Sequence, residues 1–234
     1  STSADSSVRR LAGADAIIAA HGPALPQPAQ QCGPSAAWAA LHAVVTDPPS
    51  VCELALASGT RIWPHDTPSW RPPGAPLDRR GWDVLAVADA IEESGTDAAG
   101  LARGLTRVVP GVAVVPAAGP GDARGLLEAL VELDRRVGVV ANLRTGPVAP
   151  AAMRWDVGHF VVVWGTCGGR IALADSYVEL GAPGLPAGSR LVEAGSLDVA
   201  TAERGLLLLA APDDSPAAES AVVAAGFSVG LWST

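Results

Sequence analysis

The sequence predicts an α+β fold in one domain, with helices first and a mainly antiparallel sheet after them. Apolar residues at helical spacing recur in the first part of the chain. Short apolar and β-branched runs, two of them divided by a Gly-rich turn, follow from residue 137 onward. No internal repeat or clear linker divides the 234 residues, and helices followed by strands are typical of α+β proteins. We expect residues 1–211 to form the domain and 212–234 a C-terminal tail.

Five segments are expected to be helical because their apolar residues recur at helical spacing or because good helix formers dominate them. They are Val8–Ala20, Cys32 to about Val45, Ser50–Ser58, Gly81–Ser94 and Gly121–Arg136. Gly and Pro residues end the first helix, and Thr46-Asp47-Pro48-Pro49 stops the second. Among these segments, Gly81–Ser94 has the clearest helical spacing of apolar residues.

Five further segments are expected to be strands because they are short, apolar and rich in β-branched residues. They are Val108–Pro116, Val137–Leu143, His159–Trp164, Arg170–Tyr177 and Leu206–Ala211. The Gly-rich turn at 165–169 would join the third and fourth of them as a hairpin. Arg144–Val157 and Val178–Arg190 read as loops, Ala24–Gln31 as an extended approach, and Ser1–Ser7 as a lead-in.

A long irregular segment, Gly59–Arg80, contains five prolines together with Trp63 and Trp70. Loops of this length are usually functional or disordered. Two interpretations stay open: an ordered flap beside the functional site, or surface chain whose Trp rings fill the core.

Composition excludes several classes of function. A net charge of −8 argues against a nucleic-acid-binding surface. The chain has no Lys, so a phosphate-loop Lys, a Schiff base and a Ser-Lys pair are impossible. No apolar run is long enough to span a membrane. Three Cys residues make a poor disulfide framework, and Ser1–Gly13 lacks a signal-peptide core. We expect a cytoplasmic protein, with secretion left open.

Cys32 is the first candidate for a reactive residue. It stands directly before Gly33 and Pro34 at the start of a predicted helix. The positive end of the helix dipole and unpaired N–H groups at that position favour the thiolate, which is the nucleophilic form. A buried, inert cysteine is the competing interpretation. Cys32, His42, Cys52 and His65 lack the spacing of a zinc site, and no metal or other cofactor is expected.

His159 and Asp175 are placed to assist such a nucleophile. If the turn around Cys167 makes a symmetric hairpin, His159 lies directly opposite Asp175, with Cβ atoms roughly 4.5–5.5 Å apart. The carboxylate would then fix the imidazole tautomer and stabilise imidazolium. A His so held is a general base and acid for Cys32. A surface bond between the two side chains is the alternative.

These motifs resemble the papain-like bacteriocin-processing (double-glycine leader) peptidases and their stand-alone relatives. The residues that carry the likeness are Gln-…-Cys32-Gly-Pro-Ser-Ala-Ala-Trp, Gly158-His159-Phe-Val-Val-Val and Ile-Ala-Leu-Ala-Asp175-Ser. The resemblance implies a papain-like cysteine-proteinase fold with the nucleophile on the central helix. It further implies Cys32 as nucleophile, His159 as base and acid, and Asp175 as the orienting residue.

The same resemblance implies an oxyanion hole made by a Gln side chain and the Cys32 backbone N–H. Gln27 is the choice by distance, while Gln30 and Gln31 compete. We expect Gly158, Trp63 and Trp70 to contact substrate. Two departures from the family pattern stand out: Ser176 replaces the usual Pro, with little expected effect on chemistry, and Pro48–Arg80 looks inserted.

Three functions remain open at this stage. The first is a peptidase or amidase that forms an acyl-enzyme on Cys32 and acts on a peptide. The second is an acyltransferase or cyclase of natural-product biosynthesis that takes an acyl group from a carrier-protein thioester. The third, a non-catalytic binding module, is disfavoured because the Cys, His and Asp are all present.

Overall fold

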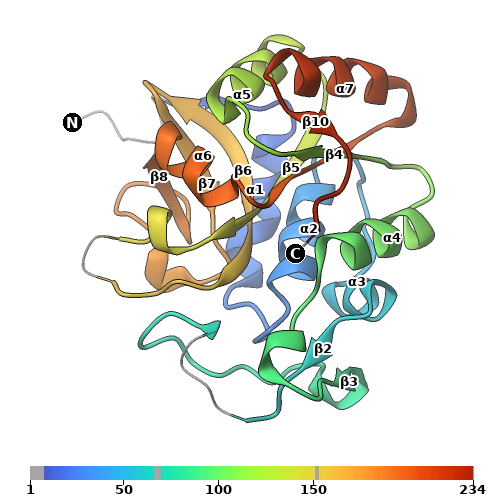
Figure 1. Cartoon of the computed structure of the whole chain (residues 1–234), viewed down its shortest axis with the longest axis vertical. Helices are drawn as coiled ribbons and strands as arrows, with labels where there is room; N and C mark the ends of the chain where they lie inside the picture. The colour runs from blue at the N-terminus through green and yellow to red at the C-terminus, as the bar shows by residue number, and fades with distance from the viewer. Residues whose placement is uncertain (1–7, 66–69, 151–152, 234) are drawn as a thin grey trace.

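A computed structural model describes residues 8–65, 70–150 and 153–233 of the chain (Figure 1). Its main sheet has the strand order β10-β4-β9-β5-β6-β7-β8, and a short β1 pairs with β6. Every pairing in this sheet is antiparallel among the described residues. The strands are β1 (Arg9–Arg10), β4 (Ala113–Ala118), β5 (Val137–Arg144), β6 (Gly158–Cys167), β7 (Arg170–Ala174), β8 (Ser189–Glu193), β9 (Gly205–Ala210) and β10 (Ser228–Val229).

Helices pack around this sheet, and the α+β class expected from the sequence is confirmed. They are α1 (Ala14–His21), α2 (Cys32–Leu41), α3 (Val51–Ser58), α4 (Ala98–Val108), α5 (Ala123–Glu132), α6 (Ala194–Thr201) and α7 (Ser215–Ala224). In Figure 1, α5 and α7 lie together at one end of the molecule, while β2 (Arg61–Ile62) and β3 (Ala86–Val87) lie at the other.

The central helix α2 is held against the sheet by small residues. All of its residues except Cys32 and Trp38 are buried, and it packs on β5 and β6. Gly138 of β5 permits the close approach, because a Cβ atom there would lie 2.2 Å from the backbone oxygen of Ala40. Pro34 sits in the first turn, where it removes no helical hydrogen bond. The helix as a whole, with Cys32 as its first residue, is therefore packed closely on the sheet.

The predicted helix at Gly81–Ser94 is wrong. The segment instead forms two short 3₁₀ turns, Trp82–Val84 and Ile91–Glu93, on either side of β3. Its apolar residues do not share one buried face: Leu85 is buried, whereas Val84 is 50% exposed and Val87 is 59% exposed. β3 pairs in parallel with β2, and this pairing to residues 20 or more positions away outweighs the local helical pattern.

Other boundaries differ from the expectations for tertiary reasons. Arg9 and Arg10 pair with β6 instead of starting a helix, and α1 begins only at Ala14. A helix missed by the sequence analysis, α4, begins after Asp97, whose carboxylate accepts a hydrogen bond from the backbone N–H of Gly100. The strand expected at Val108–Pro116 consequently begins only at Ala113.

The second half of the chain follows the predicted order more closely. The helix at α5 and the strands β5, β6, β7 and β9 all lie within the expected segments or extend them by a few residues. β8 and α6, which were not expected, lie between β7 and β9. The segment expected to be a tail contains α7 and β10, and β10 pairs with β4 at the edge of the main sheet.

Within the described residues, no helix combines the length and apolarity needed to cross a bilayer.

Candidate active site

The residues that the sequence analysis singled out lie together at one end of the strands β5, β6 and β7. β6 begins there at Gly158 and His159, beside the end of β5, because Leu143 pairs with His159. β7 ends on the same side of the sheet, since its last residue, Ala174, pairs with Val162 of β6. Cys32 is the first residue of α2, which packs against β5 and β6. Antiparallel pairing thus brings together residues separated by more than 120 positions in the chain.

His159 links Cys32 to Asp175. Its Nε2 atom lies 2.9 Å from Oδ1 of Asp175, and both side chains are buried. The His159 side chain also interacts with the Cys32 thiol and lowers its pKa through hydrogen-bonding and charge effects. Because Nε2 is used by the carboxylate, Nδ1 is the ring nitrogen available to the thiol. The imidazole thus lies between a thiol whose pKa it lowers and a carboxylate to which it is hydrogen-bonded.

The symmetric hairpin register expected for this pair is wrong. Val162 pairs with Ala174 and Val163 with Leu173, and the register shifts again between Val163 and Gly165. The pairing at the site is therefore displaced by two residues from the symmetric one. Side chains alternate faces with a period of two, so a two-residue shift leaves Asp175 on the face of His159. Asp175 is a diagonal neighbour of His159, and diagonal neighbours remain within reach.

Electrostatics at the site favour a charged pair. Burial by itself raises the pKa of the Cys32 thiol, but the hydrogen bond and positive charge of His159 outweigh burial and lower it. For His159, burial lowers the pKa, whereas the attraction of Asp175 and its hydrogen bond raise it. The net result is a His159 pKa of about 10. A thiolate facing an imidazolium is the form that these shifts support.

Asp175 has two further partners that the sequence analysis missed. Arg190 donates a hydrogen bond from Nη1 to Oδ2 of Asp175 at 2.9 Å, and the Tyr177 backbone N–H donates to Oδ1 at 3.1 Å. Asp175 is fully buried and Arg190 nearly so. Burial raises the pKa of the Asp175 carboxyl, yet the charges of His159 and Arg190 hold it well below its usual range.

Two aromatic rings cover the His159–Asp175 pair. The Trp155 ring lies edge-on to His159 with centroids 5.2 Å apart, and the Tyr177 ring lies 5.6 Å from the same imidazole. Trp155 falls in a segment expected only to be a loop. The covered imidazole is 3% exposed, so water is largely kept from the hydrogen bond to Asp175.

The three candidate glutamines differ in what their side chains bind. Gln30 makes two hydrogen bonds with the backbone of Trp63, and Gln31 donates from Nε2 to the backbone oxygen of Arg80. Gln27 accepts a hydrogen bond from the Ser176 hydroxyl through Oε1. Among the described residues no hydrogen bond is assigned to Gln27 Nε2. Gln27 thus keeps both N–H donors of its amide unused, whereas Gln30 and Gln31 each use one, and Ser176 fixes the orientation of Gln27.

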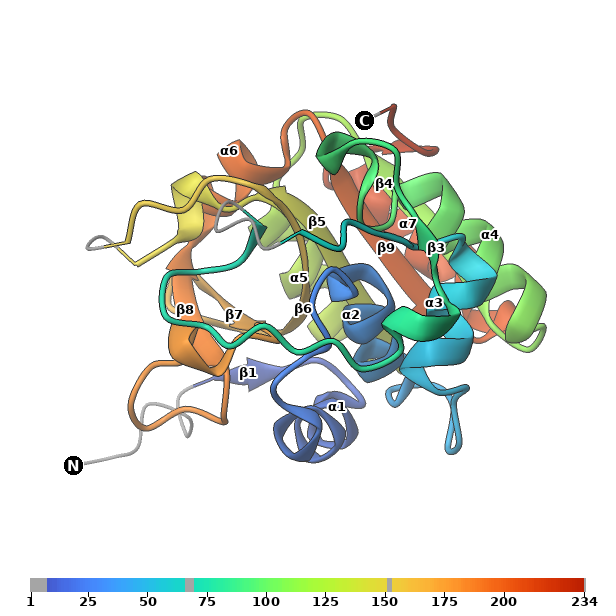
Figure 2. The same cartoon turned by 90° about the horizontal axis from the view of Figure 1, so that it is seen from below.

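The segment expected to be a flap, Gly59–Arg80, forms hydrogen bonds with the residues just before Cys32. Residues 66–69 of this segment lie outside the described part of the chain. In Figure 2 the segment passes across one end of α2. Besides the contacts of Gln30 and Gln31, Asp78 accepts a backbone hydrogen bond from Ala29. The backbone oxygen of Trp70 is 3.5 Å from the Tyr177 hydroxyl. Trp63 and Trp70 are both half-buried.

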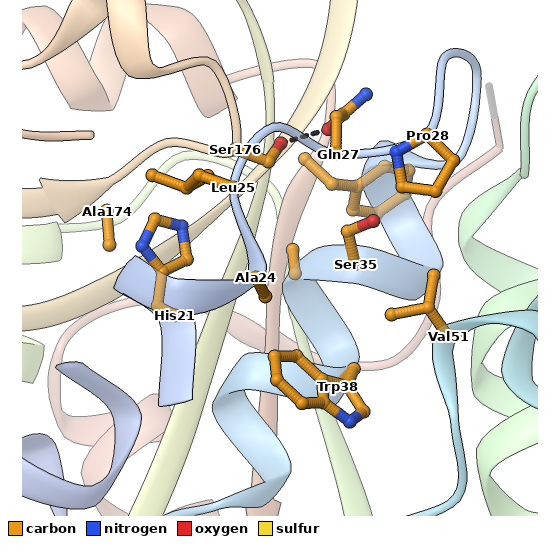
Figure 3. A pocket seen from close by; sticks show the side chains of 12 residues that line it. His21, Ala24, Leu25, Gln27, Pro28, Ser35, Trp38, Val51, Ala174 and Ser176 are labelled. Atoms are coloured by element: carbon orange, nitrogen blue, oxygen red, sulfur yellow. Dashed lines mark hydrogen bonds between the residues drawn. The ribbon is translucent and has the colours of Figure 1, made fainter. Parts of the chain in front are cut away.

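A small cavity of about 30 Å³ lies beside Gln27 (Figure 3). Figure 3 shows His21, Ser35 and Ser176 around it, with the Ser176 hydroxyl bonded to Gln27. The volume has room for about one or two waters and is too small for a substrate side chain of any size. The described residues contain no cluster of His, Cys, Asp or Glu able to hold a metal ion.

The chain belongs to a family of unknown function (DUF6885), whose pattern matches residues 11–233. No curated protein matches the sequence. A solved structure described as a "putative C39-like peptidase from Bacillus anthracis" is similar, with a TM-score of 0.50 and 13% identity. The match covers 86% of this chain and 96% of that one. At this identity the likeness shows the fold alone, which is the α+β papain-like fold that the motifs imply.

Proposed function

We propose that the chain is a cysteine-nucleophile enzyme that works through an acyl-enzyme on Cys32, most simply as a peptidase or amidase. The observation that carries this proposal is the buried His159–Asp175 hydrogen bond together with a neighbouring Cys32 thiol whose pKa His159 lowers. A fold shared with a C39-like peptidase supports the same class of reaction. Fold likeness alone would not suffice, because one fold hosts many functions.

In the acylation step the Cys32 thiolate attacks the substrate carbonyl carbon, and the carbonyl oxygen becomes an oxyanion. Cys32 is the first residue of α2, so its backbone N–H has no acceptor within the helix. That N–H and the Nε2 amide of Gln27 are the proposed oxyanion donors. When the tetrahedral intermediate collapses, the proton of the His159 imidazolium passes to the leaving amine and the C–N bond breaks.

In the deacylation step the neutral His159 takes a proton from water, and the resulting hydroxide attacks the thioester. The C–S bond breaks, the acid product leaves and the imidazolium–thiolate pair is restored. Asp175 acts through His159: it holds the imidazole by Nε2, leaves Nδ1 toward Cys32, and stabilises the positive ring.

Transfer to an amine, hydroxyl or carbon in place of water is the second candidate. Trp155 and Tyr177 cover His159, and the flap lies over the chain leading to Cys32. A covered acyl-enzyme excludes water and favours another acceptor. The substrate would then be an acyl thioester, such as one on a carrier protein, and Trp63 and Trp70 would help to choose it.

One experiment tests both candidates. The protein is incubated with a set of peptides and with acyl-carrier thioesters, and its intact mass is measured after rapid acid quenching. We expect a covalent adduct on wild type with at least one class of donor and none on Cys32→Ala. Loss of the adduct with water alone supports hydrolysis, whereas loss only on addition of an amine supports transfer. An adduct of equal yield on Cys32→Ala would contradict the proposed nucleophile.

A further inference from the structure

A second arginine, Arg204, lies at the same end of the strands as the proposed nucleophile. It sits in the turn between α6 and β9, directly before Gly205, which pairs with Asn142 of β5. Its Nη1 atom donates to Oδ1 of the buried Asn142 at 3.0 Å. Its guanidinium group also covers Gly158: a Cβ built on that glycine would lie 3.0 Å from Nη2. The guanidinium therefore fills the space beside the residue that precedes His159.

Arg204 has no ion-pair partner within the described part of the chain. Among the described residues no Asp or Glu oxygen is assigned to it within 4.0 Å. Neighbouring Arg144 differs, because it makes bonds of 2.7 and 3.1 Å to the Asp156 carboxylate. Burial first, and then repulsion by Arg144, lower the pKa of Arg204, while the attraction of Cys32, Glu203 and Asp156 opposes them. A half-buried cation thus lies beside Gly158, the residue before His159, with donor capacity to spare.

We propose that Arg204 binds a carboxylate on the substrate next to the bond that is cleaved. The substrate class would be acyl donors with an acidic side chain or free carboxylate beside the scissile carbonyl. This inference rests on the proposed function and deepens it. A guanidinium group has five donors in a planar fork, and Arg204 is assigned one of them, to Asn142. A carboxylate can accept two of the remaining donors side by side.

The exposed Gly158 leaves space for the guanidinium group of Arg204. Any larger residue there would press against the guanidinium group and compete for the space in front of it. The protein has a net charge of −8, so its overall field repels anionic substrates. The guanidinium group beside Gly158 offsets that repulsion locally, where an acidic substrate would bind. A site built for a charged partner also rejects uncharged analogues, because its half-buried cation would stay unpaired.

The decisive test uses two small alkylating agents and needs no knowledge of the substrate. Iodoacetate carries a carboxylate, and iodoacetamide has nearly the same size without the charge. We measure their rates with Cys32 by peptide mass mapping, which separates it from Cys52 and Cys167. We expect Arg204→Gln to lower the iodoacetate-to-iodoacetamide ratio about five- to tenfold relative to wild type.

The matched control is Arg144→Gln, which removes a nearby arginine that is already paired with Asp156. Its ratio is expected to stay within about twofold of wild type. An equal ratio in wild type and Arg204→Gln would overturn the proposal, as would an equal fall in the control. Gly158→Asp and Gly158→Asn give a second test in which residue 204 remains arginine. Both side chains crowd the guanidinium group, but only Asp supplies a competing carboxylate, so the Asp variant should lower the ratio more than the Asn variant. No difference between them would also count against the carboxylate site.

Paired peptides then connect the site to turnover. Each pair differs only by Glu or Gln at one position flanking the scissile bond. Wild type should cleave the Glu member several-fold faster at one position, and Arg204→Gln should remove that preference. If no peptide is cleaved while the alkylation ratios behave as expected, the peptidase activity is wrong and the carboxylate site stands. If peptides are cleaved without any preference for Glu and the ratios are equal, the function stands and the site is refuted.

Discussion

Replacing Arg190 by Met removes a buried cation from the side of Asp175 opposite His159. The carboxylate is fully buried and would lose the 2.9 Å hydrogen bond to Oδ2. Breaking a buried ion pair costs about 3–5 kcal/mol when one partner is removed. Since His159 and the Tyr177 N–H still bond Oδ1, we expect the lower end, about 3 kcal/mol. For a protein of this size that free energy corresponds to a fall in Tm of about 6–12 °C.

The measurement is thermal unfolding of wild type, Arg190→Met and a control, Arg144→Met, at several pH values. Arg144 pairs with Asp156 at the surface, with about half of each side chain exposed, so the control should lose less than about 1 kcal/mol. The pKa of Asp175 is held below its usual value of about 3.9. The stability contributed by its charge is therefore present above that pH and is lost as pH falls further.

The gap between wild type and Arg190→Met should accordingly be full at neutral pH and should narrow below about pH 4. A Tm for Arg190→Met no lower than that of Arg144→Met would refute the reasoning. A gap that does not change with acid would show that Arg190 contributes through packing and not through the charge of Asp175.

Three further outcomes are expected. Asp175→Asn should fold but lose most of its turnover, on the order of 10³–10⁴-fold, because Asn cannot stabilise imidazolium; activity equal to wild type would exclude an electrostatic role. Cys32 should react with iodoacetamide near neutral pH ahead of the half-buried Cys52 and the buried Cys167, and labelling of Cys167 first with activity retained would contradict the proposed nucleophile. Trp63→Ala and Trp70→Ala should change KM, or the ratio of hydrolysis to transfer, more than Tm; a large fall in Tm with unchanged specificity would show that the rings only fill the core.

Local signals in the sequence were sufficient for much of the fold. Ser50 caps the first turn of α3 by hydrogen bonds within a few residues. The strands β5, β6 and β9 are specified by short runs of apolar and β-branched side chains. The helix expected at Gly81–Ser94 failed for the opposite reason. Its apolar residues were at helical spacing, but pairing of β3 with β2 and burial of Trp82 against Ala29 decided the structure.

The candidate nucleophile and its base could be found from the sequence alone. Cys-Gly-Pro at a helix start and Gly-His at a strand start are short motifs, and chemistry restricts which residue types can serve there. The expected proximity of His159 and Asp175 was also met, although through a diagonal pairing and not a direct one. A shift of two residues keeps side chains on one face, so an incorrect register still brought the right pair together.

Only the tertiary structure decided what surrounds that pair. Arg190 lies in β8, Trp155 in a loop, and Arg204 in the turn before β9. None of them carries a local signal, because an arginine or tryptophan in these segments has the same neighbours in sequence whether it is exposed or buried. Their roles arise from strand order, which places β8 beside β7 and β9 beside β5. The sequence determined the candidate nucleophile, its base and its acidic partner; the packing of strands distant in sequence determined the charges and rings that surround them.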